Sequence, residues 1–291
     1  MPPAERPTHT VLLATDGSPH ALLAADAAAD LAARMNAPLH LVHAWNITAL
    51  ASTPDMPMAG SALYMEGELE QLGRELLDSE TARLRAAGAT VTDTHLRLGN
   101  AAAEIVATAR AIGAALIVVG GSDAGRLERF FGGDITVGVV RGGTASQPPA
   151  SWPPASWPPA RIVIGDDGSA PAHASGTFAA AIGGLYGATA VVVRSHPTAR
   201  EAVGAPDQDL ATFAKTLTAR LGREPEVRVV DGDPADALLA VGSRGLGAFQ
   251  RLFNGSISTD VLQGAACAVL VTPSDNNPAP TAPTPATVAL S

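Results

Sequence analysis

The chain has 291 residues, of which 46% are hydrophobic and 4% aromatic, and its formal net charge is −9. This length predicts about two domains, and the negative charge excludes a surface for generic nucleic-acid binding. The single cysteine, Cys267, excludes an intramolecular disulfide. The sequence shows neither an apolar signal region nor a run of about 18 apolar residues. We therefore expect a cytoplasmic protein without a membrane or nucleic-acid partner.

The first half of the chain alternates apolar runs with helical patterns. Thr10–Ser18 (T-V-L-L-A-T-D-G-S) is an apolar run that ends in Asp-Gly-Ser, as expected for a strand buried on both faces. The elements expected after it are a helix over His20–Met35, a strand over Leu39–Ala44, a helix over Tyr64–Ala87, a strand over Thr90–Leu96, a helix over Ala102–Ile112 and a strand over Ala115–Val119. This alternation predicts a parallel sheet with right-handed crossovers.

The second half repeats this order. Arg161–Ser169 (R-I-V-I-G-D-D-G-S) is again an apolar run that ends in Asp-Gly-Ser. The expected elements are a helix over Ala172–Tyr186, strands over Ala190–Arg194, Glu226–Val230 and Ala268–Thr272, and a helix over Asp207–Leu221. Such an internal repeat predicts two domains of one fold.

Composition sets the expected domain boundaries. Residues 1–146 form the first domain and 161–273 the second. Between them, residues 147–160 contain S-W-P-P-A twice, which predicts a semi-rigid linker or a ligand for a proline-recognising domain. Residues 274–291 are rich in Pro, Ala and Thr and predict a disordered tail.

One glycine-rich stretch, Gly242–Ser258, has the spacing G-x2-G-x9-G-S. Glycines let a backbone approach a ligand closely, and a Gly-Ser pair at the start of a helix offers N–H groups and a hydroxyl to a phosphate. The spacing differs from a P-loop and from the dinucleotide motif. The alternative is a glycine-rich surface loop before a helix.

The repeat, the two Asp-Gly-Ser turns and this loop together resemble the universal stress protein family in its tandem form. The resemblance covers about Thr8–Arg141 and Arg161–Pro273. It implies an α/β fold with two tandem doubly wound parallel-sheet domains of strand order 3-2-1-4-5. It also implies ATP at the carboxyl ends of strands one and four, where open parallel sheets place ligands.

The resemblance also implies a set of site residues in the second half. Asp167, like Asp16 in the first half, stands where the family contacts adenosine. An Asp there could also cap the following helix, and the two roles can coexist. The implied ATP-binding set is Gly165, Asp167, Ser195, Gly242, Arg244, Gly245, Gly247, Gly255, Ser256 and Ser258.

The first half carries a degenerate version of the same site, formed by Ala14, Asp16, Gly120, Gly125 and Gly133. Here Asp123 and Asp134 stand opposite Gly245 and Ser256. Each carboxylate would repel a phosphate charge by about 4 kcal/mol at about 4 Å and an effective dielectric of about 20. Unless a divalent cation reverses this repulsion, we expect at most one ATP per chain.

Each domain is expected to be truncated. In the first, Asp134–Arg141 runs directly into Gly-Gly and the linker, so the fifth strand is expected to be absent. In the second, too few residues follow Val230 for a parallel crossover of about 10–12 residues. A short helix over Pro234–Ala240 and an absent or vestigial fourth strand are expected there.

No metal-binding residues are expected, because the seven histidines show neither H-x3-H nor H-E-x2-H spacing. No catalytic residues are expected either, because the sequence has no G-x-S-x-G elbow and Cys267 is interpreted as a small core residue. The resemblance implies an ATP-binding stress-response regulator, with or without Mg²⁺, and we expect it to act without fast hydrolysis. It would form a homodimer or pair its two domains within the chain. The alternatives are a non-binding interaction scaffold of the same fold and a nucleotide hydrolase of a related fold.

Overall fold

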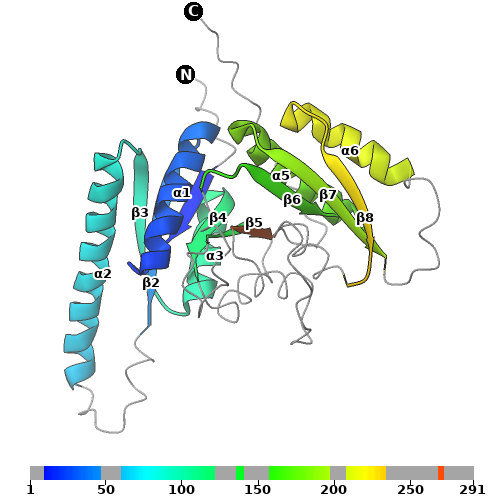
Figure 1. Ribbon diagram of the computed structural model, residues 1–291. Coiled ribbons are helices and arrows are strands. Elements are labelled where there is room, and N and C mark those ends of the chain that lie inside the picture. Colours follow the sequence, from blue (N-terminus) through cyan, green and yellow to red (C-terminus); the bar gives the residue numbers. More distant parts are fainter. Residues whose placement is uncertain are drawn as a thin grey trace, which may run out of the picture. The chain divides into compact units, whose positions relative to one another are not determined.

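The computed structural model describes residues 10–46, 60–121, 136–140, 157–196, 208–233 and 268–271 (Figure 1). These residues fall into two units. The first contains the described residues up to Gly121 together with Thr136–Val140, and the second contains those from Trp157 onward.

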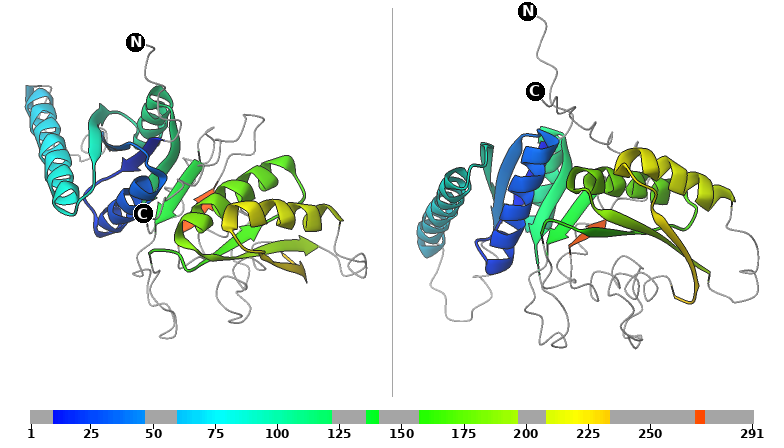
Figure 2. Two further views of the ribbon diagram at one scale, coloured as in Figure 1. Left: turned by 90° about the horizontal axis from the view of Figure 1, so that it is seen from above. Right: turned by 45° about the horizontal axis from the view of Figure 1, so that its top comes forward.

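The first unit is a five-stranded parallel sheet with helices on both faces. Its elements are β1 (Thr10–Ala14), α1 (Pro19–Met35), β2 (Leu39–Trp45), α2 (Gly60–Ala86), β3 (Val91–Leu98), α3 (Ala101–Ile112), β4 (Ala114–Gly120) and β5 (Thr136–Val140). The strand order is β3-β2-β1-β4-β5, which confirms the expected order 3-2-1-4-5. Helices α1 and α2 pack on one face and α3 on the other (Figures 1 and 2).

The expectation that the first domain lacks its fifth strand is wrong. Thr136–Val140 (T-V-G-V-V) pairs in parallel with β4, from Leu116↔Thr136 to Gly120↔Val140. Four of its five residues are β-branched, and such side chains suit a pleated surface beside another strand. The segment is therefore a strand, although the Gly-Gly pair that follows it argued for an early end of the domain.

Small side chains bring α1 close to the sheet. Most of its buried residues are alanine, and they include Ala24, Ala25 and Ala28. They face a sheet whose central side chains Leu12 and Ile117 are fully buried. The helix begins at the N-cap Ser18, whose side chain accepts a hydrogen bond from the Ala21 N–H, and ends at Asn36 in the left-handed conformation.

The second unit repeats the first part of this pattern. Its elements are β6 (Arg161–Gly165), α5 (Ala170–Tyr186), β7 (Thr189–His196), α6 (Gln208–Leu221), β8 (Glu226–Asp231) and β9 (Val269–Val271). Strands β6, β7 and β8 form a parallel sheet in the order β6-β7-β8, and α5 and α6 lie side by side on one of its faces (Figure 1). A cluster around Phe213, Leu210 and Leu217 joins α6 to the sheet.

Three expectations fall outside the described residues. They are the Pro234–Ala240 helix with the missing fourth strand of the second domain, most of the linker, and the tail. They stay predictions.

Candidate functional site

Both Asp-Gly-Ser segments form the same turn at the carboxyl end of the first strand of their unit. In the second unit Asp167 Oδ1 accepts a hydrogen bond from the Ser169 N–H at 2.9 Å, and Asp16 does the same with Ser18 in the first unit. The glycines between them, Gly17 and Gly168, have φ values of 72° and 80°, which an L side chain rarely adopts.

The helix that follows each turn is capped by the serine and not by the aspartate. Ser169 Oγ accepts a hydrogen bond from the Ala172 N–H at 3.2 Å, as Ser18 does from Ala21. The interpretation of Asp16 and Asp167 as helix N-caps is therefore wrong. Each aspartate instead orders the turn through its own backbone, as in an Asx turn.

The second-unit turn faces solvent. Asp167 and Gly165 are both exposed. Ala14, the first-unit residue that corresponds to Gly165, is only 8% exposed. Hydrogen bonds from the Ser169 side chain and backbone hold the pKa of the Asp167 carboxyl below its usual value. This group is therefore an ionised acceptor at neutral pH.

Ser195 lies at the carboxyl end of the neighbouring strand β7. Its hydroxyl donates to the carbonyl of Gly232, just beyond β8, at 2.5 Å. The oxygen lone pairs of Ser195 remain able to accept. In the first unit the equivalent residue, Ala44, has no hydroxyl.

A buried ion-pair network behind the second-unit turn was missed by the sequence analysis. The Arg194 guanidinium of β7 donates from Nε to Asp166 Oδ2 at 3.0 Å and also contacts that oxygen through Nη2. Its Nη2 lies 3.2 Å from Asp209 Oδ2 of α6. The side chains of Asp166 and Arg194 are 0% and 6% exposed.

A histidine of α5 completes this network. His173 Nε2 lies 3.2 Å from Asp166 Oδ1 and 3.6 Å from Asp209 Oδ2, close to both carboxylates but without the alignment of a hydrogen bond. Its ring stacks on Phe213 with centroids 4.1 Å apart. The doubled Asp of D-D-G-S and the arginine inside V-V-V-R-S-H were the available sequence signals. Because two carboxylates already balance Arg194, this guanidinium is not free for a phosphate.

In the first unit a histidine–carbonyl contact takes the place of this network. Ala14 is in register with Val42, and Gly165 with Val193, so that His43 occupies the place of Arg194 and Thr15 that of Asp166. His43 Nδ1 lies 2.8 Å from the Thr15 carbonyl oxygen.

Gly120, at the end of β4, has a packing role in the first unit. A Cβ placed on it would lie 2.2 Å from the His20 carbonyl oxygen in the first turn of α1. Only glycine allows this approach. The other first-half loop residues, Gly125 and Gly133, lie outside the described residues.

An open groove of about 520 Å³ lies between α2 and the carboxyl ends of β2 and β3. The apolar part of the groove's lining includes Trp45 and Leu98. The charged residues of its lining are Glu66, Glu70, Arg74 and Asp78. Three carboxylates and one guanidinium give this lining a net charge of −2, which disfavours a polyphosphate in the first unit.

The glycine-rich loop is the part of the expected site that the structure does not describe. Gly242, Arg244, Gly245, Gly247, Gly255, Ser256 and Ser258 all lie outside the described residues. Of the predicted second-half set, the structure places Gly165, Asp167 and Ser195 at the carboxyl ends of the adjacent strands β6 and β7. Among the described helices, none is long and apolar enough to cross a membrane.

Two parallel α/β units, each with an Asp-Gly-Ser turn at the carboxyl end of its first strand, define the class of protein. The family model for the universal stress protein family matches residues 7–146 and 159–273. The chain belongs to the universal stress protein family, with two copies of the domain in tandem.

Several solved structures are similar. A universal stress protein from Archaeoglobus fulgidus is 17% identical with a TM-score of 0.65, and the match covers 91% of this chain and 96% of that one. A putative universal stress protein from Pseudomonas aeruginosa is 18% identical with a TM-score of 0.51, covering 91% and 93%. A family protein from Burkholderia pseudomallei is 31% identical with a TM-score of 0.35, covering 42% and 87%. A search of curated proteins found no match.

Proposed function

We propose that the protein is a cytoplasmic stress-response regulator that binds ATP in its second unit. The observation that carries this proposal is the exposed second-unit turn, in which an ionised Asp167 lies beside exposed Gly165 at the carboxyl end of β6. Open parallel sheets bind ligands at this end of their strands, and a carboxylate is a good acceptor for the ribose hydroxyls.

The remaining contacts would come from β7 and from the loop that matches the family spacing. Ser195 would line the base pocket, and the N–H groups and hydroxyls of the loop would hold the phosphates, with or without Mg²⁺. The loop set is Gly242, Arg244, Gly245, Gly247, Gly255, Ser256 and Ser258. The buried Arg194 would act behind the site, because its charge is already balanced by Asp166 and Asp209.

The first unit supports nucleotide binding less well. Its turn residue Ala14 is buried, its groove carries excess carboxylate, and its loop sequence contains Asp123 and Asp134. We propose one ATP per chain, bound without fast turnover, because no general base or arginine finger is evident beside the loop sequence.

Calorimetry with ATP tests this proposal. Asp167→Ala should weaken binding roughly 10-fold or more, because a charged acceptor is lost. The matched control Asp16→Ala removes the same turn carboxylate from the first unit and should leave the affinity unchanged. Two equivalent sites, or equal effects of the two variants, would contradict the assignment to the second unit.

The alternative function is an interaction scaffold that has lost its nucleotide. The short sequence after Val230, which leaves too few residues for a full crossover in the second unit, favours it. Mass spectrometry of the native purified protein separates the two. A co-purifying adenine nucleotide supports ATP binding. A protein that is free of nucleotide, and that gives no heat on titration with ATP and Mg²⁺, supports the scaffold.

A further inference from the structure

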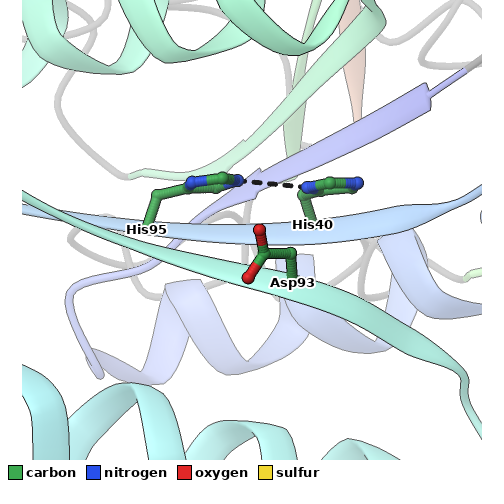
Figure 3. A group of neighbouring side chains, drawn as sticks. All are labelled: His40, Asp93 and His95. Carbon is green, nitrogen blue, oxygen red and sulfur yellow. Dashed lines mark hydrogen bonds between the residues drawn. The ribbon is translucent and has the colours of Figure 1, made fainter.

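Two histidine rings of the first unit meet across neighbouring strands. His40 Nδ1 of β2 lies 3.1 Å from His95 Nε2 of β3, and the two ring planes are within 3° of each other. Figure 3 shows the rings edge to edge, with the carboxylate of Asp93 directed towards them from β3. One candidate ligand atom from each of the three residues lies within 4.8 Å of the others.

A register shift creates this cluster. Leu39 pairs with Val91, but His40 pairs with Asp93, so that β3 contributes one additional residue at this point. Because side chains alternate between the faces of a strand, the extra residue transfers Asp93 and His95 to the face that carries His40. The three donors therefore converge although His40 and His95 are 55 residues apart.

The cluster lies on the face covered by α3. Arg97, two residues after His95 and hence on the same face, donates from Nε to Thr108 Oγ1 of α3 at 3.2 Å. Both histidines are half-buried, whereas Asp93 is exposed on β3, the outermost strand of the first unit's sheet. The site thus combines two fixed imidazoles with an opening to solvent.

These donors match the preferences of a borderline divalent metal. Imidazole nitrogens and a carboxylate oxygen are ligands for Zn²⁺ and its neighbours in the first transition row. Two nitrogens bound to one tetrahedral Zn²⁺ at 2.0–2.1 Å lie about 3.4 Å apart, close to the observed 3.1 Å. We propose that His40, Asp93 and His95 bind a divalent transition-metal ion of the zinc class, with the fourth position open to water.

The charges of the cluster support the same conclusion. Burial lowers the pKa of both His40 and His95, which favours the neutral rings that a metal needs. Asp93 supplies one negative charge towards a divalent ion. On binding, the ring that donates in this pair would carry its proton on its other nitrogen, so that both facing nitrogens present lone pairs to the ion.

The proposed metal site is separate from the nucleotide end of its own sheet. His40 is the second residue of β2 and Trp45 the last, so that about 17 Å of strand separates them. The ion would tie the outermost strand β3 to β2. Metal binding is therefore independent of the proposed function, and either can fail alone.

Titration of the full-length, chelator-treated protein with ZnCl₂ tests the proposal. We expect one Zn²⁺ per chain at micromolar concentrations, and a rise in the thermal midpoint on binding. His40→Gln and His95→Gln should each weaken binding roughly 10-fold or more, and the double variant should abolish it. The matched control is His43→Gln, on the same strand but the opposite face, which keeps a donor for the Thr15 carbonyl and should bind Zn²⁺ like the parent.

A second measurement needs no variant. In ¹⁵N-histidine NMR of the parent protein, Zn²⁺ should shift two imidazoles together, one through Nδ1 and one through Nε2. Co²⁺ should give the absorption of a four-coordinate nitrogen–oxygen site. No binding at micromolar Zn²⁺, or binding that the double variant or His43→Gln shows to use other histidines, would overturn the proposal.

Discussion

Arg194 and Asp166 form a buried ion pair across β7 and the end of β6, with the Arg194 Nε 3.0 Å from Asp166 Oδ2. Both side chains are almost fully buried. Arg194→Met leaves the buried Asp166 carboxylate without its guanidinium partner, and breaking a buried pair in this way typically costs about 3–5 kcal/mol. We therefore expect Arg194→Met to lower the free energy of unfolding by about 3 kcal/mol or more, measured in urea, and Asp166→Asn to lower it by less, because Asp209 still faces Arg194.

The first unit provides the matched control for this pair. The double variant Asp166→Thr with Arg194→His copies Thr15 and His43, and it should be more stable than Asp166→Thr alone or Arg194→His alone. Arg34→Met removes an exposed pair with Asp30 and should cost about 0.5 kcal/mol or less. If the double variant is destabilised by the sum of the two single changes, the two charges are not coupled.

Gly120 tests the contact between β4 and α1. Gly120→Ala places a methyl group 2.2 Å from the His20 carbonyl oxygen, so that the helix or the strand must move, at a cost of about 1–3 kcal/mol. Gly67→Ala is the control, since nothing lies within 4 Å of its Cβ position in α2, and it should stabilise by about 0.5–1 kcal/mol. Equal unfolding midpoints for the two variants would contradict this account.

The Asp167 turn should make the free energy of unfolding depend on pH. Its folded-state pKa is lowered below the usual 3.8, chiefly by the hydrogen bonds with Ser169. A depressed folded pKa stabilises the protein above the unfolded pKa, and this contribution is lost as the pH falls through the folded pKa. The stability advantage of the parent over Asp167→Asn should be constant above about pH 5 and shrink below about pH 4. If the stability difference between the parent and Asp167→Asn does not change between pH 5 and pH 3, this prediction is wrong.

The glycine-rich loop makes a prediction that rests on its sequence. Gly245→Asp copies Asp123 of the first half and brings a like charge towards the phosphates, so that it should abolish ATP binding. Ser256→Ala removes one hydroxyl bond of roughly 0.5–1.5 kcal/mol and should weaken binding about 10-fold or less. Calorimetry measures both, with circular dichroism as the check on folding. Parent-like binding by Gly245→Asp would show that this loop does not hold the nucleotide.

The reverse exchange tests the charge argument in the first half. Asp123→Gly together with Asp134→Ser should raise the ATP affinity there and give calorimetric curves with a second site. Unchanged stoichiometry and affinity would mean that the carboxylates do not limit binding.

The sequence determined the class of fold and the place of the turn. Unbroken apolar runs such as Val11–Ala14 predict strands buried on both faces, and the structure confirms a parallel sheet with the expected order in the first unit. The Asp-Gly-Ser turns were equally clear, because Gly17 and Gly168 need a conformation that other residues avoid. Both signals are local: each lies within a few consecutive residues, so the sequence alone is enough to recognise it.

Only the tertiary structure decided the contacts between distant residues. Thr136–Val140 is a strand because β4 offers it a free edge in register. Arg194 and Asp166 pair because two strands meet side by side. His40 and His95 come together through a register shift between β2 and β3 that no spacing rule contains. The sequence shows which reactive side chains are present. Which of them meet depends on the pairing of strands that are tens of residues apart, and that pairing depends on how the whole sheet packs.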